Sequence, residues 1–268
     1  MEKPAVSAEG FYQYDKNNAY PFSAEGFFAW MNHVKPMMRS RDEAGLIPIK
    51  LFPWQEEYVR EGLGATDDTG RLKYGTCFAC VPRGEGGNFI NILWGLFRFF
   101  NGYAEEIKIA GSQHLDTMGN VIKDTPKLNN FPGLCIQSEE IGILQGEKDF
   151  LNTVKVVSKS SGICPDMTFG ILSELHDYSH RDRKFYINFL SSMRGCKNAQ
   201  VAADSLMAGT IMKDEYKLWK EGKTVRTYFH YRTSDDGYQN PNITPEFIEE
   251  ERHRFTEDEF RMYWENKP

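Results

Sequence analysis

The sequence predicts an α/β fold in which a mostly parallel β-sheet is flanked by helices. Short apolar runs of strand length recur along the chain, at residues 76–81, 106–110, 153–157, 168–172 and 200–203. Segments with helical periodicity lie between several of them, at residues 88–100, 114–124 and 184–193. Strands that alternate with helices usually pair in parallel, so we expect any ligand to bind beyond the carboxyl ends of the strands.

The composition is typical of a folded globular protein. Among the 268 residues, 40% are hydrophobic and 26% are charged, which excludes a disordered chain and allows a sizeable core. No apolar run approaches the roughly 20 residues that span a bilayer. The first residues lack the basic and apolar regions of a signal peptide. We therefore expect a cytoplasmic protein without a membrane partner. The net charge of −6 gives no indication of a DNA-coating surface.

The cysteines form no recognisable framework. Their number, five, is odd and their spacing is scattered, which argues against disulfide pairing. Cys77 and Cys80 make a C-x-x-C motif, but no second pair completes a zinc site. Both lie in an apolar run, so we expect buried structural thiols.

The chain divides into an N-terminal arm and helix (1–50), a core (51–243) and a C-terminal helical segment (244–268). In the first part, Ser23 ahead of a run of apolar residues is a helix N-cap. In the last part, Thr244 precedes a proline, and Thr256 precedes a glutamate by three residues. Both patterns are typical of helix starts.

A glycine-rich segment lies between a predicted strand and a predicted helix. Its glycines Gly84, Gly86 and Gly87 allow left-handed dihedral angles and close approach to a ligand. A phosphate group binds well at such a place, because backbone N–H groups at a helix N-terminus face the anion. When the segment is aligned with G-x-x-x-x-G-K-[S/T], Gly87 stands at the lysine and Asn88 at the hydroxyl residue.

The charges of this loop leave its role open. Arg83 is the only cation within it, and Glu85 opposes that charge. A phosphate-binding loop normally needs the lysine for the phosphates and the hydroxyl for Mg²⁺. Local sequence alone favours a plain glycine-rich turn between a strand and a helix.

A second candidate motif follows the apolar run 168–172. Glu174 comes directly after this predicted strand, where a carboxylate can polarise an attacking water, while Ser173 stands where an Mg²⁺-binding aspartate would be expected. The alternative is that Glu174 is only a solvated residue or a helix cap. Histidine and aspartate residues at 176–182 lack the spacing of a metal cluster, so we predict no metal site among them.

Taken in order, these pieces resemble the ATPase domain of tailed-phage terminase large subunits, a P-loop NTPase of the ASCE group. The matching segments are 51–55, 81–86 (Walker A entry), 109–113 with 124–128, 162–176 (Walker B), 201–205 (coupling motif) and 240–266. The resemblance covers about residues 50–268. It implies a phage or prophage DNA-packaging motor that couples ATP binding and hydrolysis to viral genome packaging into the procapsid.

The resemblance also implies roles for individual residues and partners. Gln55 would seat the adenine, residues 83–88 would hold the phosphates, and Glu174 would be the catalytic carboxylate. Arg194 is a candidate arginine finger. The implied cofactors are ATP and Mg²⁺. The implied partners are double-stranded DNA, the portal protein and the small terminase subunit, with copies of this chain forming a ring, or a monomer in isolation, in the bacterial host cytoplasm. We expect no nuclease activity from this chain, because the 268 residues leave no room for the family's nuclease domain.

The departures from the family leave open whether the chain is an active enzyme. The Walker A lysine and hydroxyl and the Walker B aspartate are replaced by Gly87, Asn88 and Ser173. Arg83 for charge, and Asp177 or Asp204 for Mg²⁺, are the candidate substitutes. One alternative is therefore a catalytically inactive terminase-like protein with a structural or regulatory role. Another is an unrelated α/β binding module whose glycine loop holds a different anion.

Overall fold

The computed structural model describes residues 20–40, 44–102, 105–145, 149–159, 166–193 and 198–267. Gly162 and Pro165 of the Walker B-like segment and the candidate finger Arg194 lie outside the described residues.

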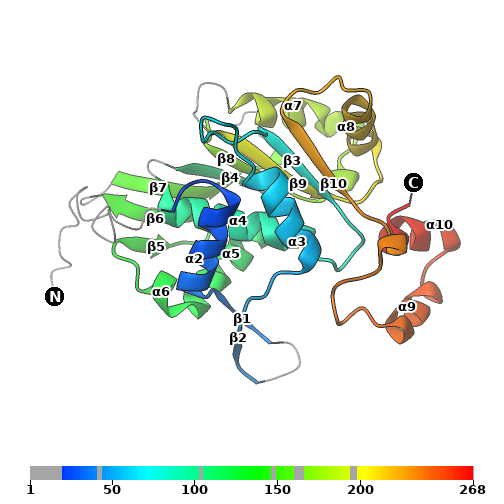
Figure 1. Cartoon of the computed structure of the whole chain (residues 1–268), viewed down its shortest axis with the longest axis horizontal. Helices are drawn as coiled ribbons and strands as arrows, with labels where there is room; N and C mark the ends of the chain where they lie inside the picture. The colour runs from blue at the N-terminus through cyan, green and yellow to red at the C-terminus, as the bar shows by residue number, and fades with distance from the viewer. Residues whose placement is uncertain are drawn as a thin grey trace.

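The fold is built on an eight-stranded sheet with the order β10-β3-β9-β8-β4-β7-β6-β5 (Figure 1). In chain order, its strands are β3 (Thr76–Cys80), β4 (Glu106–Ala110), β5 (Leu134–Ile136), β6 (Glu140–Gln145), β7 (Asp149–Val156), β8 (Phe169–Leu172), β9 (Gln200–Ser205) and β10 (Thr227–Tyr231). The pairs from β10 to β7 are parallel, and β7, β6 and β5 pair antiparallel. The predicted mostly parallel α/β sheet is confirmed.

Helices cover both faces of the sheet (Figure 1). The α-helices are α2 (Ala24–Val34), α3 (Pro53–Tyr58), α4 (Gly87–Asn101), α5 (Ser112–Asp124), α6 (Pro126–Asn129), α7 (Arg183–Ser191), α8 (Thr210–Lys220), α9 (Pro245–Arg252) and α10 (Glu257–Phe260). The two faces of the sheet carry two separate hydrophobic cores, and strand β3 contributes to both. Cys77 and Ala79 pack with α4 and α5, whereas Phe78 and Cys80 pack with α7 and α8. Alternate residues of a strand point to opposite faces, so β3 is buried on both.

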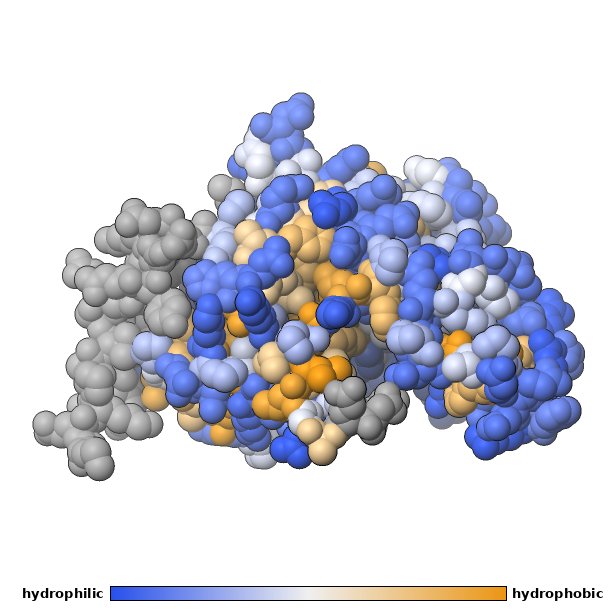
Figure 2. Space-filling model, turned by 60° about the horizontal axis from the view of Figure 1, so that its bottom comes forward, coloured by the Kyte–Doolittle hydropathy of each residue, from blue (hydrophilic) through white to orange (hydrophobic). Residues whose placement is uncertain are grey.

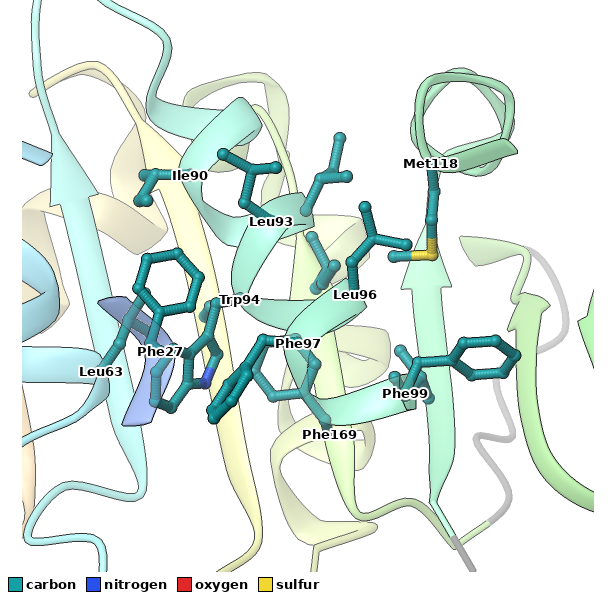
Figure 3. Packing of buried hydrophobic residues seen from close by; sticks show 14 of the residues in the cluster. Phe27, Leu63, Ile90, Leu93, Trp94, Leu96, Phe97, Phe99, Met118 and Phe169 are labelled. Atoms are coloured by element: carbon teal, nitrogen blue, oxygen red, sulfur yellow. The ribbon is translucent and has the colours of Figure 1, made fainter. Parts of the chain in front are cut away.

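Helix α4 is the centre of the larger core. Residues on all its sides are fully buried, among them Trp94 and Phe97. Figure 3 shows them packed with Phe27 of α2, Met118 of α5 and Phe169 of β8. A helix that is apolar all round is expected to lie inside a protein rather than on its surface.

Smaller elements frame the open edge of the sheet. An antiparallel hairpin of β1 (Met37–Arg39) and β2 (Leu46–Pro48) lies ahead of α3. Helices α9 and α10 form a separate lobe at the C-terminal end (Figure 1). Their predicted caps are confirmed, since the hydroxyls of Thr244 and Thr256 accept the backbone N–H groups of Phe247 and Glu259. None of the helices in the described ranges is both long and apolar enough to cross a membrane.

Candidate functional site

The glycine turn connects β3 to the N-terminus of α4. Gly84 and Gly86 have positive φ angles of 83° and 79°, and Gly86 is the N-cap of α4. A Cβ atom at Gly86 would lie 3.0 Å from the side-chain nitrogen of Gln55, so the turn also needs glycine for space. No side chain caps the helix. The first N–H groups of α4 are therefore available to an anion, as the sequence predicts.

A pocket of about 1040 Å³ opens at this turn. Its walls come from the β1–β2 hairpin, the glycine turn, the segment after β8, the end of β9 and the C-terminal segment. Figure 2 shows hydrophobic residues in the middle of this face, beside a hollow that separates them from the hydrophilic C-terminal lobe at the right. The turn and Glu174 line the same pocket rather than opposite sides of the sheet.

Most of the sequence-predicted residues meet in this pocket. Those that line it are Gln55, Arg83, Gly84, Gly86, Gly87, Asn88 and Glu174. The parallel register explains the meeting, because Cys80 pairs with Ser205 and Leu172 pairs with Ala203. The carboxyl ends of β3, β9 and β8 therefore lie at one edge.

Gln55 is buried and holds the glycine turn. Its Nε2 donates a hydrogen bond to the carbonyl oxygen of Gly86 over 3.2 Å, and its Oε1 accepts one from the N–H of Phe52 over 2.9 Å. With both ends of its amide engaged, Gln55 fixes the position of α3 relative to the phosphate-binding candidate.

Glu85 is turned away from the pocket. Its side chain is 1% exposed, and its Oε1 accepts hydrogen bonds from the backbone N–H groups of Gln239 and Asn240, each over 3.0 Å. Asn240 also donates from Nδ2 to the carbonyl oxygen of Gly84 over 2.7 Å. Glu85 thus fastens the turn to the segment that leads into α9 and does not oppose the charge of Arg83 at the pocket.

Arg83 provides a cation at the pocket rim. Its guanidinium lies 5.4 Å from the centre of the Tyr263 ring. The backbone N–H of Arg83 donates a hydrogen bond to the carbonyl oxygen of Tyr263 over 2.9 Å. The hairpin side adds Arg39 and Lys50, which also line the pocket. Sequence reasoning missed these two, because nothing local to them indicates that the hairpin folds over the turn.

Glu174 stands at the end of β8 in the left-handed region, with a φ of 53°. Its Oε2 lies 3.2 Å from Nε2 of His176. Nδ1 of His176 accepts a hydrogen bond from the backbone N–H of Leu206 over 3.3 Å, which turns Nε2 of the ring toward the Glu174 carboxylate. Strained backbone at a strand end is typical of functional sites.

Asp204 is a buried carboxyl group at the base of the pocket. Its Oδ2 accepts hydrogen bonds from Oγ of Ser173 over 3.0 Å and from the N–H of Glu174 over 3.3 Å. Neither its Oδ1 nor the buried amide of Asn91 completes a hydrogen bond of ordinary geometry, although the Asn91 side chain lies close enough to Asp204 to lower the pKa of its carboxyl group. Burial first, and then the Glu174 carboxylate, raise the pKa of Asp204 to about 7. A Cβ atom at Gly87 would lie 3.3 Å from the Asp204 Cβ.

Within the described residues, no group of three or more His, Cys, Asp or Glu side chains is arranged to hold a metal ion by itself. Asp177, a candidate Mg²⁺ ligand, has a side chain that is 68% exposed and lies 3.6 Å from Nε2 of His176. Any cation in this pocket must therefore complete its coordination with water or with a ligand's own oxygens.

Comparisons with known proteins identify the fold. No family model and no curated protein matches the chain. Among solved structures, the bacteriophage HK97 large terminase matches with a TM-score of 0.69 at 13% identity, over 91% of this chain and 55% of that one. The ATPase domain of the Thermus phage P74-26 large terminase gives 0.57 at 16% identity, over 81% and 94%. The large terminase of a thermophilic bacteriophage, in complex with ATP-γ-S, gives 0.56 at 12% identity, over 80% and 52%.

These matches agree with the topology. The chain spans about half the length of the HK97 large terminase and of the ATP-γ-S-bound large terminase, 55% and 52%, and 94% of the P74-26 ATPase domain overlaps with it. The glycine turn follows β3, which lies between β10 and β9 in the sheet, and Glu174 follows β8, the next strand beyond β9. The chain has the fold of the ATPase domain of phage large terminases.

Proposed function

We propose that the chain is the nucleotide-binding ATPase domain of a phage-type DNA-packaging terminase large subunit. The observation that carries this proposal is the shared pocket of the glycine turn and Glu174 at the carboxyl ends of parallel strands. In this fold that edge is where ligands bind, and a helix N-terminus with free N–H groups attracts phosphate.

The pocket provides different surroundings for the two ends of ATP. Phosphates would lie at Gly84–Gly87, with Arg83 at the rim as the nearest cation of the turn. The base would lie toward Phe52 and Gln55, on the side of the hairpin, whose Met38, Ile47 and Pro48 give that wall an apolar surface. Mostly apolar walls with a few polar groups are typical of sites for small molecules.

Mg²⁺ is the cation that ATPases of this fold use, and when bound it would neutralise charge on the phosphates. The pocket supplies the carboxylate of Asp204, and oxygen donors of this kind are the ligands that Mg²⁺ prefers. The buried Oδ1 of Asp204, which completes no hydrogen bond, is an observation that fits a cation at this place.

Glu174 is the residue we assign to orienting and activating water. His176 holds its carboxylate at 3.2 Å, which limits the directions in which it can point. The chain lacks the lysine at position 87. Removal of one preorganised contact to a transition state typically costs about 3–4 kcal/mol. We therefore expect ATP binding with slow hydrolysis.

DNA translocation, the portal protein, the small subunit and a ring of copies enter only as parts of this proposal. The solved structures that share the fold are large terminases, and this chain spans half of two of them. The net charge of −6 means that any contact with double-stranded DNA depends on a local basic surface.

The test is a calorimetric titration with ATP and Mg²⁺, together with a phosphate-release assay. The chain is compared with its Gly87→Lys/Asn88→Thr variant, which restores the missing cation and hydroxyl. We expect the restored variant to bind ATP roughly tenfold more tightly or better, the factor that corresponds to about 1.4 kcal/mol. If neither protein binds ATP while both remain folded, the assignment of the turn is wrong.

The same assay separates the inactive alternative. This alternative is motivated by position 87, where the chain has glycine in place of the lysine of an active loop. ATP binding without measurable phosphate release, with turnover restored in the variant, would identify a terminase-like protein with a structural or regulatory role. Turnover by the unaltered chain would exclude that role.

A further inference from the structure

We propose that Asp204 is the carboxylate that binds the divalent cation of this site, so that the cation-binding acid has moved from the end of β8 to the neighbouring strand β9. This inference rests on the proposed nucleotide-binding function. The sequence resemblance places the expected acid at position 173, directly after β8, where this chain has Ser173. Asp204 lies one strand away, near the end of β9.

The side chains of positions 173 and 204 reach the same point in space. Ser173 Oγ lies 3.0 Å from Asp204 Oδ2, and both side chains are buried. Strands β8 and β9 are parallel neighbours in which Leu172 pairs with Ala203, so the next residues along each strand are also opposite one another. A carboxylate from β9 therefore takes the place of one from β8, and the serine adds a hydroxyl oxygen.

Asp204 has no counterion in the part of the chain that the structure describes. The residue is 6% exposed, its Oδ1 has no hydrogen-bond partner, and none of the ion pairs among the described residues includes it. Asp204 nevertheless lines the pocket beside Gly87. A buried carboxylate without a paired charge is costly, and proteins resolve this by protonation, with a partner ion or with a metal. A divalent cation from the pocket supplies the missing charge.

The chemistry of the surroundings favours Mg²⁺ or Mn²⁺ over a metal held by the protein alone. The described residues offer no cluster of three metal-binding side chains. Mg²⁺ commonly binds through one or two carboxylates and completes its coordination with water and substrate phosphates. At Gly87 the chain has no ammonium group beside Asp204. The cation would therefore also supply the positive charge that a lysine supplies elsewhere.

The experiment measures Mn²⁺ binding directly, by electron paramagnetic resonance on the full chain without nucleotide. Asp204→Ser should weaken Mn²⁺ binding roughly tenfold or more. The exchanged double variant Ser173→Asp/Asp204→Ser should restore most of it, since the carboxylate returns to the same point from β8. Asp68→Ser is the matched control, because this exposed carboxylate lies in a turn outside the pocket and should leave Mn²⁺ affinity unchanged.

Asp204→Asn keeps the size of the side chain and replaces the exchanged variant if circular dichroism shows that the latter does not fold. Asp204→Asn should weaken Mn²⁺ binding by a factor similar to that of Asp204→Ser. Equal affinity in the unaltered chain and Asp204→Asn would overturn the inference. ATP titration with saturating Mn²⁺ distinguishes the two proposals. Mn²⁺ bound through Asp204 without ATP binding supports the cation site and refutes the nucleotide function. If ATP and Mn²⁺ bind equally well to the unaltered chain and to the Asp204 variants, the cation site is refuted but the nucleotide function is not.

Discussion

Helix α4 connects two regions that differ in whether their buried polar groups have hydrogen-bond partners. Toward its C-terminal end, Trp94 Nε1 donates to Gln200 over 2.9 Å, and the buried Arg98 is paired with Glu105 over 3.1 Å. At its N-terminal end, the amide of Asn91 and the Oδ1 of Asp204 are buried without partners. Buried polar groups are usually satisfied, and two of the exceptions among the described residues lie at the end of the helix that faces the pocket. Stability and function thus separate along one helix.

The largest loss of stability is expected in the core region. Phe97 is fully buried, and its ring lies 5.6 Å from that of Phe27 and 5.1 Å from that of Trp94. Phe97→Ala should lower the free energy of unfolding by about 3–5 kcal/mol, because it removes buried apolar area and leaves a cavity. Guanidinium unfolding measures it.

The matched control for this change is Ile187→Ala, at a side chain on α7 that is 50% exposed. Its effect should stay within about 0.5 kcal/mol. If both substitutions cost the same, the packing around α4 does not dominate stability and the contrast between the two regions fails.

A smaller loss is expected where the glycine turn is fastened. Glu85→Ala leaves the N–H groups of Gln239 and Asn240 without their acceptor, which should cost about 1–3 kcal/mol. Glu85→Gln keeps an acceptor oxygen of the same reach and should cost less. Thermal unfolding of both variants checks this order. An alanine variant as stable as the glutamine variant would show that the fastening contributes nothing to the fold.

A pH-dependent effect is expected at His230 of β10, whose ring stacks on Trp54 at 5.5 Å. Burial first, and then the charge of Arg232, lower the pKa of His230 from 6.5 to about 4. The unfolded chain therefore binds more protons between these values, so the stability that the neutral ring provides is present above pH 6.5 and is lost as the pH falls toward 4. His230→Phe should remove this part of the acid sensitivity.

The measurement for His230 is the denaturant midpoint at pH 7 and pH 5 in both proteins. We expect a larger fall in the unaltered chain than in His230→Phe. The same fall in both would assign the acid sensitivity to other groups. Because Trp54 lies beside Gln55 on α3, protonation of His230 should also weaken the support of the glycine turn.

The sequence predicted the parts of this fold whose signals are local. Strands β3, β4, β8 and β9 are rich in apolar residues, and α4 is a long apolar segment after glycines, so each was predicted to within a few residues. The short strand β5 and the edge strand β10 were not predicted, because most of their residues are only partly buried and β10 pairs with a strand that is distant in sequence. The same holds for α8, where few residues face the core.

The candidate site divides in the same way. Gly84, Gly86 and Gly87 and the position of Glu174 follow from nearby sequence, and the structure places them at one pocket. The direction of Glu85 depends on a partner 154 residues away. The contact between Ser173 and Asp204 likewise joins strands that only the folded sheet brings together. Patterns within a segment cannot report such contacts.

The smallest stability effect, and the sharpest functional one, is expected for Glu174→Gln. The Glu174 side chain is 56% exposed, and glutamine has the same shape, so the free energy of unfolding should change by less than about 0.5 kcal/mol. ATP binding should persist, because Glu174 is assigned to the attacking water rather than to the phosphates. Loss of a group that activates the nucleophile should lower any phosphate release roughly a hundredfold or more. The contrast with Phe97→Ala is then complete, since one change removes stability and the other removes only turnover. Phosphate release unchanged in a folded Glu174→Gln variant would move the catalytic carboxylate elsewhere in the pocket, with Asp177 and Asp204 the remaining acids that line it.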